Sequence, residues 1–314
     1  MGPDGEQIRD AAVLRRIAEL AIPPAWTDVW ICADPQGHLQ ATGVDSASRK
    51  QYLYHEAWRA HRDRLKFESM MAFARALTRL RRRVGRDLAG EELTETRVLA
   101  CAARLLDLGF FRIGSEDYAE QNDSYGLTTL HKQHVSLNGR GAIFDYRAKS
   151  GQRRVQAIGD PDLLPVLSSL KRRRGGGENL LAYRNGRRWR EIHAEDVNAY
   201  IKAAAGGDFT AKDFRTWNAT VLAAIALAAQ PQQAGGKTAR RRAVADAIRT
   251  VAAYLGNTPA VCRASYVDPR IIDRFHSGRT IASVIERLPD GPELADERAR
   301  RRIERAVLEL LADG

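Results

Sequence analysis

Cysteine is scarce in this chain of 314 residues, and Cys32, Cys101 and Cys262 stand far apart with no Cys-x-x-Cys pair. An odd, scattered set of this kind supplies neither a disulfide framework nor a zinc site, and it is typical of a reducing compartment. The polar residues 1–10 also lack the apolar core of a signal peptide. The sequence therefore predicts a cytoplasmic protein.

Several common catalytic signatures are missing as well. The chain has no GxxxxGK[ST] phosphate loop and no GxGxxG after a strand, so it lacks the usual cradle for ATP or a dinucleotide. It has neither an HExxH pair nor a compact group of carboxylates for two metal ions. The longest apolar stretch, residues 219–229, is too short to span a bilayer and is expected to be a buried helix. We therefore predict no cofactor, no metal and no membrane partner.

Positive charge is what the chain has in excess. Lys and Arg number 50 against 39 Asp and Glu, which gives a formal net charge of +11 and a pI near 9.9. A protein this basic usually binds a polyanion, and nucleic acid is the commonest one. Acidic residues are interspersed among the basic ones, which indicates folded surfaces rather than a disordered basic tail.

Hydrophobic periodicity divides the chain into a β-containing first part and a mainly helical second part. After a helix over 11–21, strands are expected at 29–33, 38–42 and 49–55, which would form a small antiparallel sheet. In the third of these strands, alternation places Gln51 on the face opposite to the two tyrosines.

The remainder of the chain has helical patterns with one β interruption. A three-stranded meander is expected over 128–158, with Asn138-Gly139 in its first turn and Lys149 at the tip of its second hairpin. Residues 171–177, KRRRGGG, are expected to form a flexible basic loop. We predict an α+β fold whose domains are a β-containing DNA-binding domain, 1–75, and a larger, mainly α catalytic domain, 76–314.

Phosphoryl transfer that uses side chains alone needs substitutes for the charge of a metal ion. Two arginines can hold the non-bridging oxygens, and a lysine can protonate the departing oxygen. A tyrosine can attack and form a covalent phosphodiester. Such an intermediate retains the energy of the broken bond, so resealing needs no ATP.

Segments of this sequence resemble, in order, the motifs of type IB DNA topoisomerases, particularly the small poxvirus and bacterial enzymes. The N-terminal segments IPPAWTDVWI and RKQYLY resemble the N-terminal domain of that family. The catalytic motifs are matched by FFRIGSEDYAEQNDSYGLTTL (110–130), by Lys149 on its hairpin, by KDFRTWNAT (212–220) and by LGNTPAVCRASYVDP (255–269).

The resemblance implies a catalytic domain of the tyrosine recombinase and topoisomerase IB type. It also implies an isomerase that relaxes positive and negative supercoils through transient single-strand cleavage and a 3′-phosphotyrosyl intermediate. Tyr266 would be the nucleophile and Lys149 the general acid, with Arg112, Arg215 and Asn257 stabilising the transition state. The poxvirus enzymes have histidine at the position of Asn257, and an amide donates a hydrogen bond but carries no proton.

The same resemblance implies a partner and a place of action. The partner is duplex DNA, around which a monomer closes as a clamp, in the bacterial nucleoid of the cytoplasm. The strand at 49–54 matches the family strand that enters the major groove. The expected DNA contacts are Arg49, Lys50, Gln51, Tyr52, Tyr54, Tyr118 and Lys212.

Two alternative functions stay open at this point. A tyrosine site-specific recombinase shares this chemistry, but it usually carries His-x-x-Arg where this chain has Lys212-x-x-Arg215, and it usually begins with a helical domain. A non-catalytic basic DNA-binding protein is supported by the charge alone. For single residues, Tyr266 could be a core tyrosine, and Lys149 could serve solubility at a hairpin tip.

Overall fold

The computed structural model divides the chain into two compact units, residues 1–69 and 70–314. It describes the whole chain except residues 1–4, 117–118, 120–121, 140, 231–235, 290, 292–295 and 314. The predicted α+β class is confirmed, because an antiparallel sheet precedes a mostly helical core. Among the described residues, no helix is both long enough and apolar enough to cross a membrane.

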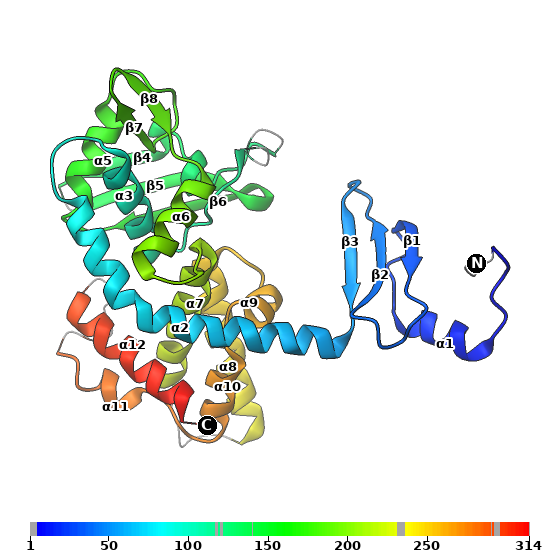
Figure 1. Cartoon of the computed structure of the whole chain (residues 1–314). Coiled ribbons are helices and arrows are strands. Elements are labelled where there is room, and N and C mark those ends of the chain that lie inside the picture. The colour runs from blue at the N-terminus through cyan, green and yellow to red at the C-terminus, as the bar shows by residue number, and fades with distance from the viewer. Residues whose placement is uncertain are drawn as a thin grey trace. The chain divides into compact units, whose positions relative to one another are not determined.

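The first unit is a three-stranded antiparallel sheet with order β1-β2-β3, and the three predicted strands are confirmed (Figure 1). A helix precedes the sheet, and its N-terminus is capped by the side chain of Asp10, which accepts from the N–H of Ala12 at 2.8 Å. The elements are α1 (Ala11–Glu19), β1 (Thr27–Ile31), β2 (Leu39–Val44), β3 (Lys50–Tyr54) and the start of α2 (Glu56–Leu88).

The two faces of this sheet differ in what covers them. On one face Trp26 packs so closely that a Cβ added to Gly43 would lie 2.7 Å from its ring, so only glycine fits there. On the other face the cross-strand partners Trp30, Thr42 and Tyr52 form a row. Trp30 and Tyr52 are each 50% exposed. This face of the sheet is therefore an aromatic surface, and no described residue of the first unit covers it.

The second unit is mainly helical and contains two small antiparallel sheets. The predicted meander is confirmed with order β4-β5-β6, and a second sheet pairs β7 with β8. The strands are β4 (Val135–Asn138), β5 (Gly141–Ala148), β6 (Gln152–Ile158), β7 (Ala182–Asn185) and β8 (Arg188–Glu191). The helices after α2 are α3 (Glu95–Leu108), α5 (Leu163–Arg172), α6 (Ala194–Ala205), α7 (Ala211–Ala228), α8 (Lys237–Leu255), α9 (Pro259–Ser265), α10 (Pro269–His276), α11 (Ala282–Ile285) and α12 (Glu297–Ala312).

Helix α7 lies at the centre of this unit. Its first turn is fixed by Asp213, whose carboxylate accepts from the backbone N–H of Thr210 at 2.8 Å. Phe214 and Trp217 are almost completely buried, and full burial of one such large side chain contributes about 3 kcal/mol. A helix that is apolar on most sides must be surrounded by protein. The buried helix predicted over 219–229 is therefore confirmed, although it begins earlier.

The basic loop predicted at 171–177 is confirmed only for residues 173–177, and one of its arginines is not exposed as expected. The first two residues of that segment end α5, and Arg173 is buried with only 8% exposure. Its guanidinium donates to the carbonyls of Leu170 at 2.9 Å and of Leu180 at 2.8 Å. Glycines 175–177 all have positive φ, which lets the chain turn back on itself. The carbonyls on both sides of this turn can then accept from Arg173.

Two other details of the second unit differ from the prediction. Residues 127–134 form two short 3₁₀ turns before β4, so the first strand of the meander is shorter than expected. The β7–β8 hairpin was not predicted, although Asn185-Gly186 between its strands is the same turn signal as in the meander.

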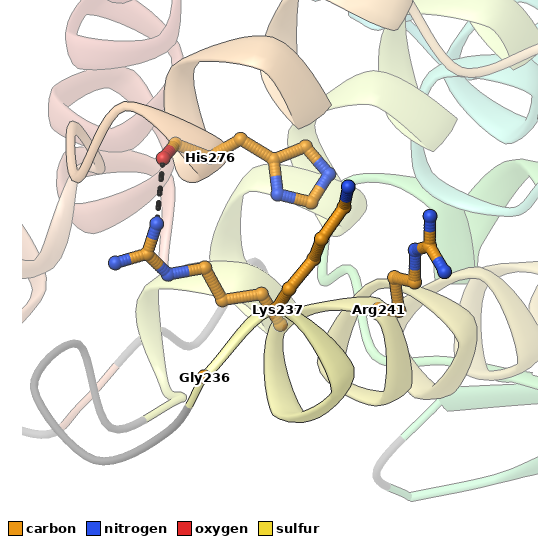
Figure 2. Close-up of a pocket in the computed structure, with 5 residues that line it drawn as sticks. Gly236, Lys237, Arg241 and His276 are labelled. Atoms are coloured by element: carbon orange, nitrogen blue, oxygen red, sulfur yellow. Dashed lines mark hydrogen bonds between the residues drawn. The ribbon is translucent and has the colours of Figure 1, made fainter.

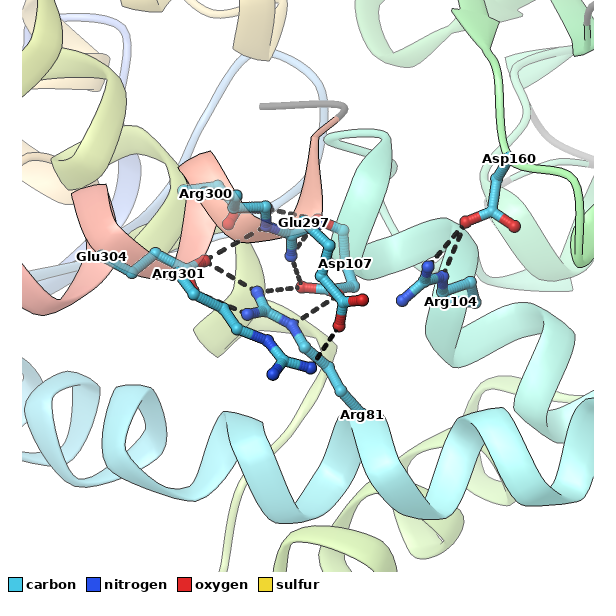
Figure 3. A network of polar contacts seen from close by, with 9 residues as sticks. Arg81, Arg104, Asp107, Asp160, Glu297, Arg300, Arg301 and Glu304 are labelled. Atoms are coloured by element: carbon cyan, nitrogen blue, oxygen red, sulfur yellow. Dashed lines mark hydrogen bonds and ion pairs between the residues drawn. The ribbon is translucent and has the colours of Figure 1, made fainter. Parts of the chain in front are cut away.

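The last helix, α12, is attached to the core through buried ion pairs (Figure 3). Arg81 of α2 donates to Asp107 of α3 at 2.9 Å and to Glu304 of α12 at 2.6 Å, and Arg300 of α12 contacts both acids. Burial alone would raise the pKa of Asp107, but the positive charges of Arg300 and Arg81 hold it well below its usual range. We call these four residues the acid-paired network.

Candidate active site

Arg112 lies in the segment that leaves α3, where the backbone is held in an unusual conformation. Phe110, two positions earlier, has a φ of 44°, which a bulky residue adopts only where its surroundings fix it. The guanidinium of Arg112 donates through Nη2 to the carbonyl of Gly256 at 2.9 Å and to the Oδ1 atom of Asn257. Two predicted site residues from distant motifs are therefore in direct contact.

Arg215 lies near the start of α7 and is only 4% exposed. It donates through Nη1 to the carbonyl of Phe110 and through Nη2 to that of Leu255 at 3.0 Å. Burial lowers the pKa of this guanidinium to about 10, and the positive charge of Arg112 acts in the same direction. Arg215 is therefore still a cation at neutral pH.

A third arginine, Arg154 of β6, reaches the same place. Its Nη1 donates to the carbonyl of Ala253 at 2.9 Å and its Nη2 donates to that of Tyr254. Together with the two motif arginines it occupies the backbone carbonyls at the end of α8, where the chain leaves the helix through Gly256 with a φ of 62°. Unsatisfied carbonyls and the helix dipole make such an end attractive to cations. We call Arg112, Arg154 and Arg215 the arginine cluster.

Tyr266 follows helix α9 and is half-buried beside the arginine cluster. The Cζ atom of Arg215 lies 5.1 Å from the centre of the Tyr266 ring. Burial alone would raise the pKa of the phenol, but Arg215, by charge and by hydrogen bonding, brings it below its usual value, with smaller contributions from Arg112 and Lys212. The site therefore makes it easier to form the tyrosinate, the form that attacks as a nucleophile, than in a free tyrosine.

The backbone of Tyr266 is fixed by a side chain from the central helix. Thr220 of α7 is fully buried, and its hydroxyl lies 3.3 Å from the carbonyl of Tyr266 and 2.9 Å from that of Thr216. The same oxygen accepts from the N–H of Asp268 at 3.2 Å. Helix α7 therefore positions Tyr266 as well as Arg215.

The fifth predicted catalytic residue, Lys149, lies outside these contacts. It is exposed at the tip of the β5–β6 hairpin, as expected from the sequence. Ser150 and Gly151, which follow it, have φ values of 65° and 71°, a pair of left-handed conformations that turns the chain sharply. The structure thus brings Arg112, Arg215, Asn257 and Tyr266 together and carries Lys149 on an extension of the neighbouring sheet.

Most of the predicted DNA contacts lie on β3 or next to it. Lys50, Tyr52 and Tyr54 are exposed on one face, and the two rings stack with centroids 6.2 Å apart. Gln51 lies on the opposite face, as alternation predicts, and donates to Asp45 at 2.8 Å.

The other predicted DNA contacts lie elsewhere. Arg49 also pairs with Asp45 and lowers the pKa of that carboxyl to about 2. Lys212 is exposed in the first turn of α7. Tyr118 lies outside the residues that the structure describes.

A basic cavity lies at the opposite end of α8 from the arginine cluster (Figure 2). Its volume is about 580 Å³, and its lining includes Lys237, Arg241 and His276. Arg240 also lines it and donates to the carbonyl of His276 at 3.1 Å. The cavity contains none of the predicted catalytic residues, so the candidate active site is at the other end of the helix.

Two residues of the site were missed by sequence reasoning. Arg154 stands outside the recognised motifs, in a hairpin with several other basic residues, and the sequence offers no signal to single it out. Thr220 did leave a signal, because it is a polar residue within an otherwise apolar stretch that was predicted to be buried. A hydroxyl in that position must bond to a neighbouring backbone group.

Comparisons with known proteins match most of this chain to one family. A family model described as the catalytic core of eukaryotic DNA topoisomerase I matches residues 55–278, and one described as the N-terminal domain of bacterial DNA topoisomerase IB matches residues 1–45. DNA topoisomerase 1B of Acanthamoeba polyphaga mimivirus is 31% identical over 261 residues, which are 81% of this chain and 77% of that protein. DNA topoisomerase 1 of Schizosaccharomyces pombe is 27% identical over 172 residues, which are 54% of this chain and 20% of that protein. The chain therefore belongs to the type IB DNA topoisomerases, enzymes whose substrate is duplex DNA.

Proposed function

We propose that this protein relaxes supercoiled DNA by cutting one strand with Tyr266 and resealing it, without ATP or a metal ion. One observation carries the proposal: the arginine cluster adjoins Tyr266 with its positive charge unneutralised. Apart from the hydrogen bond of Arg215 to Tyr266, its side chains donate to carbonyl groups and one amide, and among the described residues no carboxylate forms an ion pair with any of them. Such a cluster suits a phosphodiester, which would supply the missing negative charge.

Unused hydrogen-bond donors in the site support the same proposal. Within the described part of the chain, the Nε atom of Arg215 and the Nδ2 atom of Asn257 are buried and have no acceptor. Buried donors without partners are rare, and each one needs an explanation. A phosphate oxygen that enters the site after local adjustment would accept from both. We assign Asn257, with Arg112 and Arg215, to stabilisation of the transition state.

The chemistry then follows in two reversible steps. The Tyr266 oxygen bonds to phosphorus while the bond from phosphorus to the 5′ oxygen breaks, which leaves the protein on the 3′ phosphate. Lys149 transfers a proton to the departing 5′ oxygen, and Tyr266 loses its proton to water. Arg215, Arg112 and Lys212 assist this deprotonation, because they lower the pKa of the phenol. Attack by the 5′ hydroxyl reverses every step.

Relaxation follows from the lifetime of the covalent intermediate. The free 5′ end rotates about the intact strand, so supercoils of either sign are removed, and the retained phosphodiester energy drives resealing. We assign the grip on duplex DNA to a monomer whose two domains, 1–75 and 76–314, close as a clamp in the bacterial nucleoid. The exposed residues of β3 would lie in the major groove, with Tyr118 and Lys212 as further contacts.

Relaxation of a supercoiled plasmid in EDTA tests this function. Wild-type protein is expected to relax both positively and negatively supercoiled plasmid, and Tyr266→Phe is expected to be inactive because it lacks the nucleophilic oxygen. Tyr254→Phe is a matched control, since Tyr254 is exposed and contributes only its carbonyl to the cluster. Failure of the wild type to relax plasmid would contradict the proposal. Strand exchange between two specific sites would instead favour a recombinase.

A further inference from the structure

Arg154 reaches the same helix end as the motif arginines from a different part of the fold. Its guanidinium leaves β6 and bonds to the carbonyls of Ala253 and Tyr254, which are 99 and 100 positions further along the chain. Its cross-strand partner is Tyr146 of β5. A Cβ added to Gly256 would lie 3.1 Å from its Nη1 atom, so the guanidinium also packs against the turn that ends α8. Arg154 therefore joins the β5–β6 hairpin to the end of that helix.

Each end of this connection bears a residue of the proposed mechanism. Lys149 lies at the tip of the hairpin, five positions before Arg154, and Asn257 directly follows the turn that ends α8. On the β5 side the hairpin is held by Tyr146, which is buried and stacks on Phe111 with ring centroids 6.1 Å apart. The β6 side has mostly exposed side chains, and Arg154 anchors it.

β4 pairs with β5 only as far as Phe144, so the part of the hairpin that carries Lys149 is a two-stranded ribbon. Such a ribbon is a flexible support for a general acid, because a two-stranded hairpin by itself is only marginally stable. Proton transfer requires Lys149 to come within hydrogen-bond reach of the departing oxygen, and a misplacement of about 1 Å can cost about 100-fold in rate. The two bonds from Arg154 restrict how far the hairpin can swing from the helix end that presents Asn257.

We propose that Arg154 is a positioning residue, which holds the hairpin so that Lys149 meets the leaving oxygen of a phosphate bound at Arg112 and Asn257. This inference rests on the proposed function. Arg154 differs from Arg112 in how its nitrogens are used. Both Nη atoms of Arg154 donate to carbonyls, whereas Arg112 makes both of its described bonds through Nη2. The Nε and Nη1 atoms of Arg112 can therefore donate to an anion, whereas both Nη atoms of Arg154 already donate to backbone carbonyls.

A change of leaving group tests this role. A duplex carrying a cleavage site mapped with wild-type protein would be made with either oxygen or sulfur at the 5′ bridging position, and single-turnover cleavage would be measured. Sulfur leaves without a proton, since a thiol has a pKa of only about 8.5. With oxygen, we expect Arg154→Ala to slow cleavage by about 10- to 100-fold and Lys149→Ala by about 100- to 10,000-fold. With sulfur, both variants should regain nearly the wild-type rate.

The matched control is Arg153→Ala, because Arg153 is the exposed neighbour that pairs with Asp145. It should cleave both substrates at the wild-type rate. If Arg154→Ala fails to fold, Arg154→Lys keeps the charge but replaces two donating nitrogens on a planar fork with a single ammonium nitrogen, and it should show a smaller defect with the same rescue by sulfur.

Two results would overturn the proposal. One is a wild-type rate for Arg154→Ala on the oxygen substrate. The other is a defect of Arg154→Ala that is equally large with sulfur, which would place its effect on the phosphate clamp instead of Lys149. If wild-type protein formed no covalent complex with either substrate, the proposed function itself would have failed, so the two failures are distinguishable.

Discussion

The larger unit holds two groups of buried or half-buried arginines in opposite ways. In the acid-paired network, carboxylates of α3 and α12 pair with the guanidinium groups, and Arg81 lies 2.9 Å from Asp107 and 2.6 Å from Glu304 (Figure 3). In the arginine cluster, the partners are backbone carbonyls at the end of α8 and one side-chain amide. Carbonyls fix the position of a guanidinium but leave its net charge in place. The first group is therefore suited to hold helices together, and the second is suited to hold an anion.

Because of this difference, substitutions in the two groups should affect different properties of the protein. Removing one member of a buried ion-pair network leaves the remaining charges uncompensated, which is strongly destabilising. Removing one arginine of the cluster also relieves its neighbours of a repelling charge, since the charge of Arg112 adds to the effect of burial in lowering the pKa of Arg215. The same type of substitution should thus have its main effect on folding in one group and on catalysis in the other.

The largest effect on stability is expected for Arg81→Ala. Asp107 and Glu304 would keep Arg300 as their one remaining ion-pair partner within the network, and the free energy of unfolding should fall by about 3–5 kcal/mol. Urea unfolding followed by circular dichroism would measure this loss. DNA cleavage per folded molecule should be nearly unchanged, because none of these residues adjoins Tyr266.

Arg305→Ala on α12 is the matched control for this substitution. Arg305 is 82% exposed and pairs with Glu309, which is 64% exposed, so the change in unfolding free energy should be within about 0.5 kcal/mol. Equal losses for Arg81→Ala and Arg305→Ala would show that the acid-paired network does not hold α12 as described.

Arg215→Ala is expected to slow DNA cleavage strongly and to change the stability of the fold much less. Loss of one preorganised donor to a transition state typically costs about 100- to 1,000-fold in rate, or about 3–4 kcal/mol, and single-turnover cleavage should fall by that factor. The unfolding free energy should change by less than about 2 kcal/mol, because hydrogen bonds are lost together with a buried charge. A variant that is strongly destabilised yet cleaves at the wild-type rate when folded would remove the distinction between the two groups.

The distinction between these groups is only partly visible in the sequence. Arg112 and Arg215 could be assigned because they stand in motifs that resemble a known family. Arg81 and Arg300 could not, because an arginine on a charged helix looks the same whether it faces water or a buried acid. The pairs that join α12 to the rest of the unit lie far apart in the sequence, since Arg81 and Glu304 are separated by 223 positions and Arg300 and Asp107 by 193.

A similar limit applies to the fold. Strand alternation on β3 and the Asn138-Gly139 turn are local features, and they predicted the β segments correctly. Arg173 was assigned to a flexible loop because its basic and glycine-rich neighbours suggested solvent. Its order depends on carbonyls brought together by the fold, which no local pattern records.

The smallest expected effect is a shift in pH dependence for Lys212→Met. Lys212 is one of the charges that lower the pKa of Tyr266, so its removal should raise that pKa. Cleavage rises with the tyrosinate fraction, so the rising limb of the rate profile should move to higher pH. Single-turnover cleavage at saturating protein would separate this shift from weaker DNA binding.

Lys202→Met is the control for Lys212→Met, because it removes the same charge from an exposed residue of α6 that pairs with Asp208. Its profile should match the wild type. A profile that is also unchanged for Lys212→Met would mean that Lys212 does not influence the ionisation of the nucleophile.

The central claim is that the arginine cluster assists the attack of Tyr266 on a phosphodiester. Identifying the residue that is covalently attached to DNA tests this claim most directly. Protein trapped on a DNA substrate that cannot be resealed would be digested, and the nucleotide-bearing peptide would be identified by mass spectrometry. We predict a single adduct on Tyr266, linked through a 3′ phosphate. An adduct on another tyrosine, a 5′ linkage, or no adduct with active wild-type protein would contradict the account.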